Sequence, residues 1–163
     1  KKLKFDWENF NKIDLSLLKE NKYYNRQSMK HSIVNNYIGG LRTSSKHIKS
    51  GEIIITDAPT DNNGKGEAFS PTDLICTALC SCMTTVMGIC AEKGNFILPK
   101  SEAKIKKVMS ENPRKISEIE IEITFEKNNL SDNQKSKLIK VAEACPVAKS
   151  IDPDINQKIK FNF

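Results

Sequence analysis

Hydrophobic and polar residues alternate most clearly at positions 118–125. Isoleucine or phenylalanine occupies every second position of this segment, and glutamate or threonine occupies the positions between them. A period of two residues is typical of a β-strand with one buried and one solvent-exposed face. Short apolar segments of the same kind predict further strands within 32–55, at 103–108 and at 159–163.

The strongest helix signal lies in the middle of the chain, where positions 74–91 hold no charged residue. Ser70 suits the N-cap, Pro71 suits the first helical position, and Asp73 completes a pattern close to a capping box. The sequence therefore predicts a long helix that begins after Ser70 and ends before Gly94, where a glycine suits a left-handed stop.

An uncharged segment of eighteen residues is at the lower limit for crossing a membrane. This segment also contains several serine, threonine and cysteine residues, and charged amphipathic segments lie on both sides of it. We therefore interpret it as a central helix surrounded by the rest of a soluble domain, and we expect no membrane partner.

A second helix is predicted after Ser131. It must break at Cys145–Pro146, because proline cannot donate the hydrogen bond that continues a helix. The resulting order of elements is strands, long helix, strands, helix, short helix and strand, without regular βαβ alternation. This order favours an α+β fold with an antiparallel sheet. The domain is expected to span 32–163, and residues 1–31 are interpreted as an N-terminal extension or a leading helix.

The chain has 163 residues, about the size of one domain, and a net charge of +6. The arginines are Arg26, Arg42 and Arg114, and all other basic residues are scattered lysines. No segment combines clustered arginines with interleaved aromatic residues, as many nucleic-acid-binding surfaces do. We therefore expect no nucleic-acid partner.

The five cysteines are an odd number, and the start of the sequence shows no secretory signal pattern. A cytoplasmic location with reduced thiols is therefore expected. Four cysteines lie on the predicted central helix, where about 100° per residue places Cys76 and Cys80 on one face and Cys82 on nearly the opposite face. They cannot share one tetrahedral metal site, so we expect neither a metal nor another cofactor.

Two cysteines have surroundings that favour reactivity. Cys82 is flanked by Ser81 and by two threonines, although a structural role as a buried thiol remains an alternative for every cysteine of the helix. Cys145 precedes Pro146 at the expected start of a helical turn, where backbone N–H groups and the helix dipole favour a thiolate. It could instead fill a kink between two helices.

Two cysteine motifs resemble those of the OsmC/Ohr family. Residues 70–74 and 78–83 are similar to the central-helix signature of that family, and Cys145-Pro146-Val147 resembles its second motif. Upstream, 39–43 and 64–69 are similar to a strand and a loop of one OsmC-like branch. The resemblance covers nearly the whole chain apart from the leading segment, so the predicted domain is expected to be OsmC-like.

The resemblance implies an intertwined homodimer of α+β subunits, each with two central helices, and thiol sites at the subunit interface. It also implies a thiol peroxidase that reduces organic hydroperoxides through a sulfenic acid and a disulfide and is restored by an external dithiol. In this mapping Cys82 is the peroxidatic cysteine, Cys145 is the resolving cysteine and Arg42 holds the thiolate. Arginine suits that role because it keeps its positive charge.

One position departs from the family pattern. Well-characterised hydroperoxide reductases of the family have a glutamate ten residues before the first cysteine to orient the arginine, and this sequence has Thr72 there. Asp73 and Glu67 are candidate replacements, and Asp73 equally suits a helix cap. The departure keeps a second hypothesis open: a non-catalytic OsmC-like protein that binds a small apolar or thiol ligand at the dimer interface.

Overall fold

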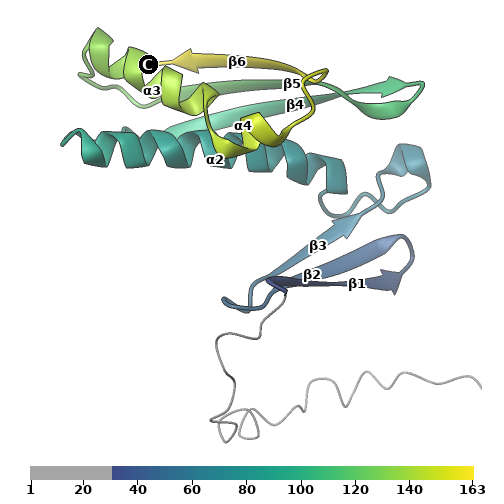
Figure 1. Ribbon diagram of the computed structural model, residues 1–163. Helices are drawn as coiled ribbons and strands as arrows, with labels where there is room; N and C mark the ends of the chain where they lie inside the picture. Colours follow the sequence, from purple (N-terminus) through teal and green to yellow (C-terminus); the bar gives the residue numbers. More distant parts are fainter. Residues whose placement is uncertain (1–30) are drawn as a thin grey trace, which may run out of the picture.

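The computed structural model describes residues 31–163, which form two three-stranded sheets and three α-helices. It confirms the predicted α+β class, with mostly antiparallel strands (Figure 1). The predicted extension or leading helix at 1–31 lies outside the described residues, except for its last position.

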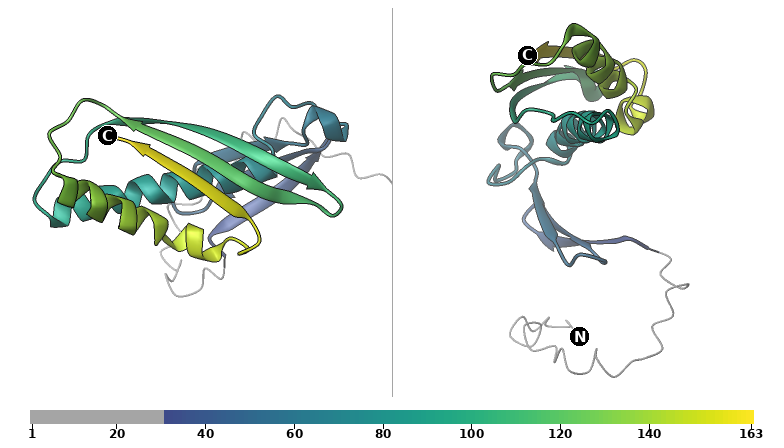
Figure 2. Two further views of the ribbon diagram at one scale, coloured as in Figure 1. Left: turned by 90° about the horizontal axis from the view of Figure 1, so that it is seen from above. Right: turned by 90° about the vertical axis from the view of Figure 1, so that its left-hand side faces the viewer.

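The first sheet pairs β1 (Ile33–Gly39), β2 (Arg42–His47) and β3 (Ile53–Asp57) antiparallel in that order. The strands predicted within 32–55 are therefore confirmed. Figures 1 and 2 show this sheet standing apart from the other elements, to which it is joined by a loop with a short 3-10 helix, η2 (Thr60–Asn62).

The second sheet has the order β4-β5-β6, with β4 at Ser101–Glu111, β5 at Arg114–Phe125 and β6 at Asn156–Asn162. Strands β4 and β5 are antiparallel, as predicted, but β6 runs parallel to β5. A parallel pair needs a long crossover connection, and here two helices between β5 and β6 provide it.

The long central helix, α2, spans Pro71–Lys93. Its predicted capping box is present: Ser70 Oγ accepts a hydrogen bond from the Asp73 N–H, and the Asp73 carboxylate accepts one from the Ser70 N–H. The predicted left-handed stop at Gly94 is wrong, because Gly94 has φ −88° and the left-handed residue is Asn95, with φ 55°. The chain thus turns one residue later than predicted.

The crossover consists of α3 (Asp132–Glu143) and α4 (Pro146–Ser150). Ser131 caps α3 in a second capping box, and the predicted break at Cys145–Pro146 separates the two helices. Figure 2 shows α3 lying alongside α2, so residues far apart in the sequence come together between these helices.

The core fills the space between α2, α3 and the inward face of the second sheet. The predicted alternation of β5 is confirmed, because its isoleucines are buried while glutamates occupy the other face. The largest fully buried apolar side chains are Leu79, Met83, Met87, Ile119, Ile121, Ile123 and Leu138. These residues come from α2, β5 and α3 and form one cluster, so the second sheet and both helices share a single core.

Helix α2 is covered on one side only within a single chain. Seven of its residues are buried, whereas Ile75 and Ile89 on another side remain 43% and 46% exposed. The expectation that the rest of the domain surrounds this helix is therefore met for only part of its surface. By length and mean hydropathy, 1.9 over its most apolar window, α2 resembles a membrane-crossing helix, but 39% of that window is buried in the protein.

Candidate active site

The structure brings Cys82 and Cys145 together. Cys82 lies in the middle of α2, and Cys145 is the N-cap of α4, at the break between α3 and α4. Cys82 packs against the core cluster that contains Cys145, and the two thiols are near enough for Cys82 to raise the pKa of Cys145. This proximity makes the two thiols candidates for a disulfide.

The two thiols differ in their access to solvent. Cys145 is buried, with 1% of its surface exposed, whereas Cys82 is half-buried. Cys82 is therefore the more exposed of the two thiols. This difference favours Cys82 as the thiol that reacts first.

The predicted N-cap position of Cys145 is confirmed, because its Sγ accepts a hydrogen bond from the Ala148 N–H at 3.3 Å. The net effect on ionisation is the reverse of the expected one. Burial raises the pKa of Cys145, and the adjacent Cys82 raises it further, although the backbone N–H groups of Ala148 and Val147 act to lower it. Cys145 is therefore held as a neutral thiol.

Arg42 is held by two carboxylates. Its Nε donates to Asp57 Oδ1 at 2.6 Å and its Nη2 donates to Asp57 Oδ2 at 2.8 Å, a paired geometry that fixes the guanidinium plane. Nη2 also donates to Glu67 Oε2 at 2.6 Å. The hydrogen bonds that Arg42 donates to Asp57 and Glu67 raise the pKa of Arg42, and those donated to Asp57 hold the pKa of Asp57 below its usual range.

Arg42 forms no hydrogen bond or ion pair with Cys82 or Cys145 within residues 31–163. Figures 1 and 2 show why: β2, which carries Arg42, belongs to the sheet that stands apart from the two cysteines. Within one chain the structure therefore unites the two thiols but not the predicted cation.

Asp57 is a site residue that the sequence reasoning missed. Its side chain is fully buried, and Oδ2 also accepts a hydrogen bond from the Glu67 N–H at 3.0 Å. The pairing of β2 with β3 could have revealed it, because Asp57 ends β3 and lies directly opposite Arg42 of β2. A buried carboxylate requires a partner, and the residue opposite Asp57 is Arg42.

The two candidate replacements for the missing glutamate have different surroundings. Glu67 contacts Arg42, whereas Asp73 caps α2 and accepts a hydrogen bond from Lys107 Nζ at 2.6 Å. Thr72 also faces Lys107, whose Nζ donates to its hydroxyl at 2.8 Å. Although burial acts to raise the pKa of Asp73, the hydrogen bonds from Lys107 and Ser70 lower it overall. Asp73 thus anchors the start of α2 to β4.

Residues 64–160, more than half of the chain, match the family model described as OsmC-like protein. The chain belongs to the OsmC-like protein family. A solved structure described as an osmotic stress induced and detoxification response protein from Psychrobacter arcticus is 48% identical, covering 81% of this chain and 96% of the other, with a TM-score of 0.77.

More distant OsmC-like structures share the fold. An organic hydroperoxide resistance protein OsmC from Legionella pneumophila is 16% identical over 82% of this chain and 98% of its own, with a TM-score of 0.65. The organic hydroperoxide resistance protein OhrB of Bacillus subtilis is 14% identical over 81% and 98% of the two chains, with a TM-score of 0.57. No curated protein matches the sequence.

The remaining thiols of this OsmC-like domain lie on the buried side of α2. Burial raises the pKa of Cys76 and of Cys80, and Cys90 is 8% exposed. Among residues 31–163, no three His, Cys, Asp or Glu side chains gather closely enough to hold a metal ion. The chemistry that this part of the chain offers is therefore that of the Cys82 and Cys145 thiols.

Proposed function

We propose that this OsmC-like protein reduces organic hydroperoxides with its own thiols. The observation that carries the proposal is the proximity of the half-buried Cys82 to the buried Cys145. Family membership and the fold shared with hydroperoxide resistance proteins support a peroxide-related role. The two thiols have different environments, and each environment suits a different step of the reaction.

In the first step the Cys82 thiolate attacks one peroxide oxygen and the O–O bond breaks. Cys82 becomes a sulfenic acid, and the other oxygen takes a proton and leaves as an alcohol. The Cys145 sulfur then attacks the Cys82 sulfur, forming a disulfide, and the hydroxyl group leaves with a proton as water. An external dithiol returns both cysteines to thiols and is itself oxidised to a disulfide.

The environment of Cys145 suits the second step. As a neutral, buried thiol it does not compete with Cys82 for peroxide, and its proton is available to the departing water. Its contact with Cys82 places it next to the sulfenic acid as soon as that group forms. Over-oxidation of Cys82 by a second peroxide is therefore disfavoured.

We also propose that the protein acts as a homodimer, which would bring the separate sheet of one protomer to the cysteines of the other. Exposed apolar side chains on and near that sheet support this arrangement: Ile33, Val34, Tyr37, Ile53, Ile54 and Phe69. Exposed residues also recur every three or four positions along one face of α2: Ile75, Ala78, Ser81, Thr85 and Ile89. Such a stripe is typical of a helix that packs against a partner.

In such a dimer Arg42 would supply the positive charge at the thiol pair. Nη1 of Arg42 makes no hydrogen bond to the described residues, whereas Nε and Nη2 are occupied by carboxylates. Nη1 is therefore the donor that can face a thiolate or a developing alkoxide. Asp57 and Glu67 would position the guanidinium.

The second hypothesis is a non-catalytic protein that binds a small apolar or thiol ligand. It is favoured by Thr72, which faces Lys107 instead of an arginine. An organic hydroperoxide resistance protein from Vibrio cholerae, 15% identical over 85% of this chain and 96% of its own with a TM-score of 0.61, was solved with captopril bound in one of its active sites. That structure shows only that a site of this fold can hold such a ligand.

Steady-state turnover separates the two hypotheses. The purified protein, supplied with dithiothreitol, is expected to consume cumene hydroperoxide, and Cys82→Ser is expected to abolish consumption. Cys76→Ser is the matched control, because it removes a thiol of the same helix away from Cys82 and Cys145. Equal rates for Cys82→Ser and the unaltered protein would reject the peroxidase mechanism.

A further inference from the structure

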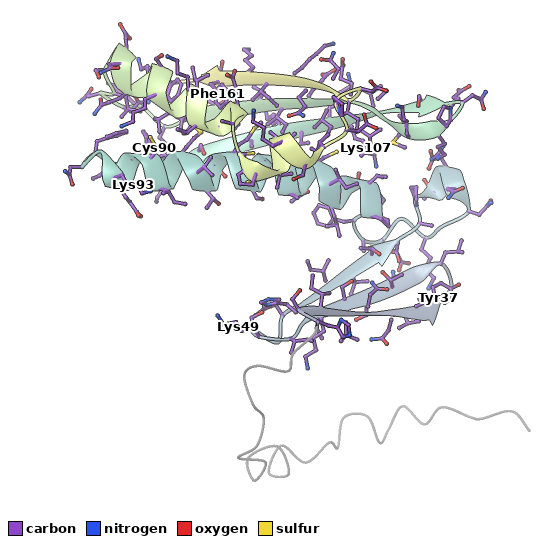
Figure 3. The ribbon with its side chains drawn as sticks, in the orientation of Figure 1. Tyr37, Lys49, Cys90, Lys93, Lys107 and Phe161 are labelled. Carbon is purple, nitrogen blue, oxygen red and sulfur yellow. The ribbon has the colours of Figure 1, made fainter. Side chains whose placement is uncertain are left out.

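Gln157 places a polar side chain on the inward face of β6. Its neighbours on that face, Ile159 and Phe161, pack against the core, and Figure 3 labels Phe161 on this strand. Positions 156, 158 and 160 lie on the opposite, exposed face. An amide that is half-buried among apolar groups costs free energy unless it is hydrogen-bonded. Gln157 therefore requires a partner.

The partner of Gln157 is the short helix α4. Its Nε2 donates a hydrogen bond to the Ala148 carbonyl at 3.3 Å. The carbonyls of residues 145–147 accept hydrogen bonds from residues 149–151, which are the last donors of the helix and its cap. The Ala148 carbonyl comes next, at the end of the helix, where backbone donors run out. Gln157 thus supplies from β6 the donor that α4 lacks.

Helix α4 needs such an anchor because it is only five residues long. A helix of that length does not hold its conformation in water by itself. Apolar contacts of Val147 and Ile151 with the core hold one side of it, and the hydrogen bond from Gln157 adds a link with a fixed direction. Gln157 is itself fixed, since it pairs with Ile119 of β5, which is fully buried.

The residue that Gln157 holds also contacts the buried thiol. The Ala148 N–H donates to Cys145 Sγ at 3.3 Å, while the Ala148 carbonyl accepts from Gln157. The centre of the second sheet is therefore connected to Cys145 by a short series of contacts through β6 and α4. A shift of Ala148 would move the backbone group against which the sulfur rests.

We propose that Gln157 is a positioning residue, which holds α4 so that the Cys145 sulfur stays in place to attack Cys82. This inference rests on the proposed function and concerns its disulfide-forming step. That step depends on the placement of two sulfurs, so a small displacement of one of them slows it. The first step needs Cys82 alone, and Gln157 forms no hydrogen bond to Cys82 within residues 31–163. Gln157 therefore affects only the second step.

The test variant is Gln157→Met, which keeps the length of the side chain and removes the donor. The matched control is Lys158→Met, which places the same residue at the next position of β6, on the exposed face. Each full-length protein receives one equivalent of cumene hydroperoxide. Rapid quenching and intact mass spectrometry then follow the sulfenic acid and the disulfide separately, so both steps are measured in one sample. Unfolded protein would lower the amplitude of both steps and leave the ratio of their rates unchanged.

Gln157→Met is expected to form the sulfenic acid at the unaltered rate and the disulfide roughly two- to tenfold more slowly, the effect of losing one hydrogen bond. The sulfenic acid should accumulate as a result. Lys158→Met is expected to match the unaltered protein in both steps. Disulfide formation at the unaltered rate in Gln157→Met, or an equal slowing of both steps, would overturn the proposal. Equal slowing of the second step in the two variants would overturn it too.

Diamide distinguishes this inference from the proposed function, because it oxidises two neighbouring thiols to a disulfide without a hydroperoxide and is itself reduced to a hydrazine. Slower diamide oxidation of the Cys82–Cys145 pair in Gln157→Met, with no reaction of any of the proteins with hydroperoxide, would support the inference and contradict the peroxidase mechanism. Hydroperoxide reduction with equal disulfide formation in all three proteins would contradict the inference and leave the mechanism intact. Absence of a Cys82–Cys145 disulfide with either oxidant would overturn both.

Discussion

Arg42 and Asp57 face each other across neighbouring strands and share two hydrogen bonds, at 2.6 and 2.8 Å. The Asp57 side chain has no exposed surface, so its charge depends on the guanidinium. The two hydrogen bonds to Asp57 fix the plane of the Arg42 guanidinium. Nη1 makes no hydrogen bond to residues 31–163, so it can donate to a ligand or to a thiolate. The Arg42–Asp57 pair therefore links β2 to β3 and also orients the guanidinium for its proposed role at the thiols.

Asp57→Asn is expected to lower the melting temperature more than Glu67→Gln does. The first change removes one member of a buried charged pair, whereas Glu67 is an exposed second partner of Arg42. Asp61→Asn, which breaks an exposed pair with Arg114, is the matched control. Thermal unfolding followed by circular dichroism measures all three, and equal shifts would show that the Arg42–Asp57 pair has no special role.

The stability of the protein is expected to fall as the pH falls below about 4, the ordinary range of carboxyl groups. Asp57 has a lowered pKa in the folded state because of its hydrogen bond from Arg42, so the unfolded chain binds protons more readily. Its contribution is fully present above the unfolded pKa and is lost as the pH passes down through the folded pKa. Denaturant unfolding at several pH values should show a shallower fall for Asp57→Asn.

Asp73→Ala is expected to reduce the free energy of unfolding by about 1 kcal/mol, because it removes a capping box. The change also breaks the link between α2 and Lys107 of β4. Since Asp73 contacts Lys107 and not Arg42, the initial rate of hydroperoxide reduction should be nearly unchanged. A loss of activity without a loss of stability would show that Asp73 takes part in the reaction and is not only a helix cap.

Cys145→Ser is expected to allow one reaction with hydroperoxide and then to stop. The altered protein can form the sulfenic acid at Cys82 but has no adjacent thiol to displace water from it. Dimedone labelling followed by peptide mass spectrometry should locate the adduct on Cys82. Sustained turnover by Cys145→Ser would show that another thiol resolves the sulfenic acid.

Local signals allowed much of this fold to be predicted from sequence. The capping residues Ser70 and Ser131 and the break at Pro146 depend on nearby backbone geometry, so their positions could be predicted from neighbouring residues. The parallel pairing of β6 depends on the path of the whole crossover, which no local pattern encodes. Which side of α2 stays exposed likewise depends on how the other elements pack against it, and the local sequence of the helix does not encode this.

In the candidate site, too, some features could be predicted from neighbouring residues and others depend on tertiary structure. The N-cap position of Cys145 was predictable, but its raised pKa depends on burial against α2 and on contact with Cys82. The role of Glu67 became clear only when the folded loop placed it at Arg42, and Asp57 became visible only with the strand register. Charges far apart in sequence are paired by tertiary structure, which residue spacing alone does not specify.

The central claim is that Cys82 and Cys145 act as one redox pair, and disulfide mapping after a single equivalent of cumene hydroperoxide tests it most directly. We predict that the intact protein loses two hydrogen atoms, that the linked peptides contain Cys82 and Cys145, and that dithiothreitol reverses the change. A link between other cysteines, or a Cys82 that stays reduced while hydroperoxide is consumed, would contradict the account.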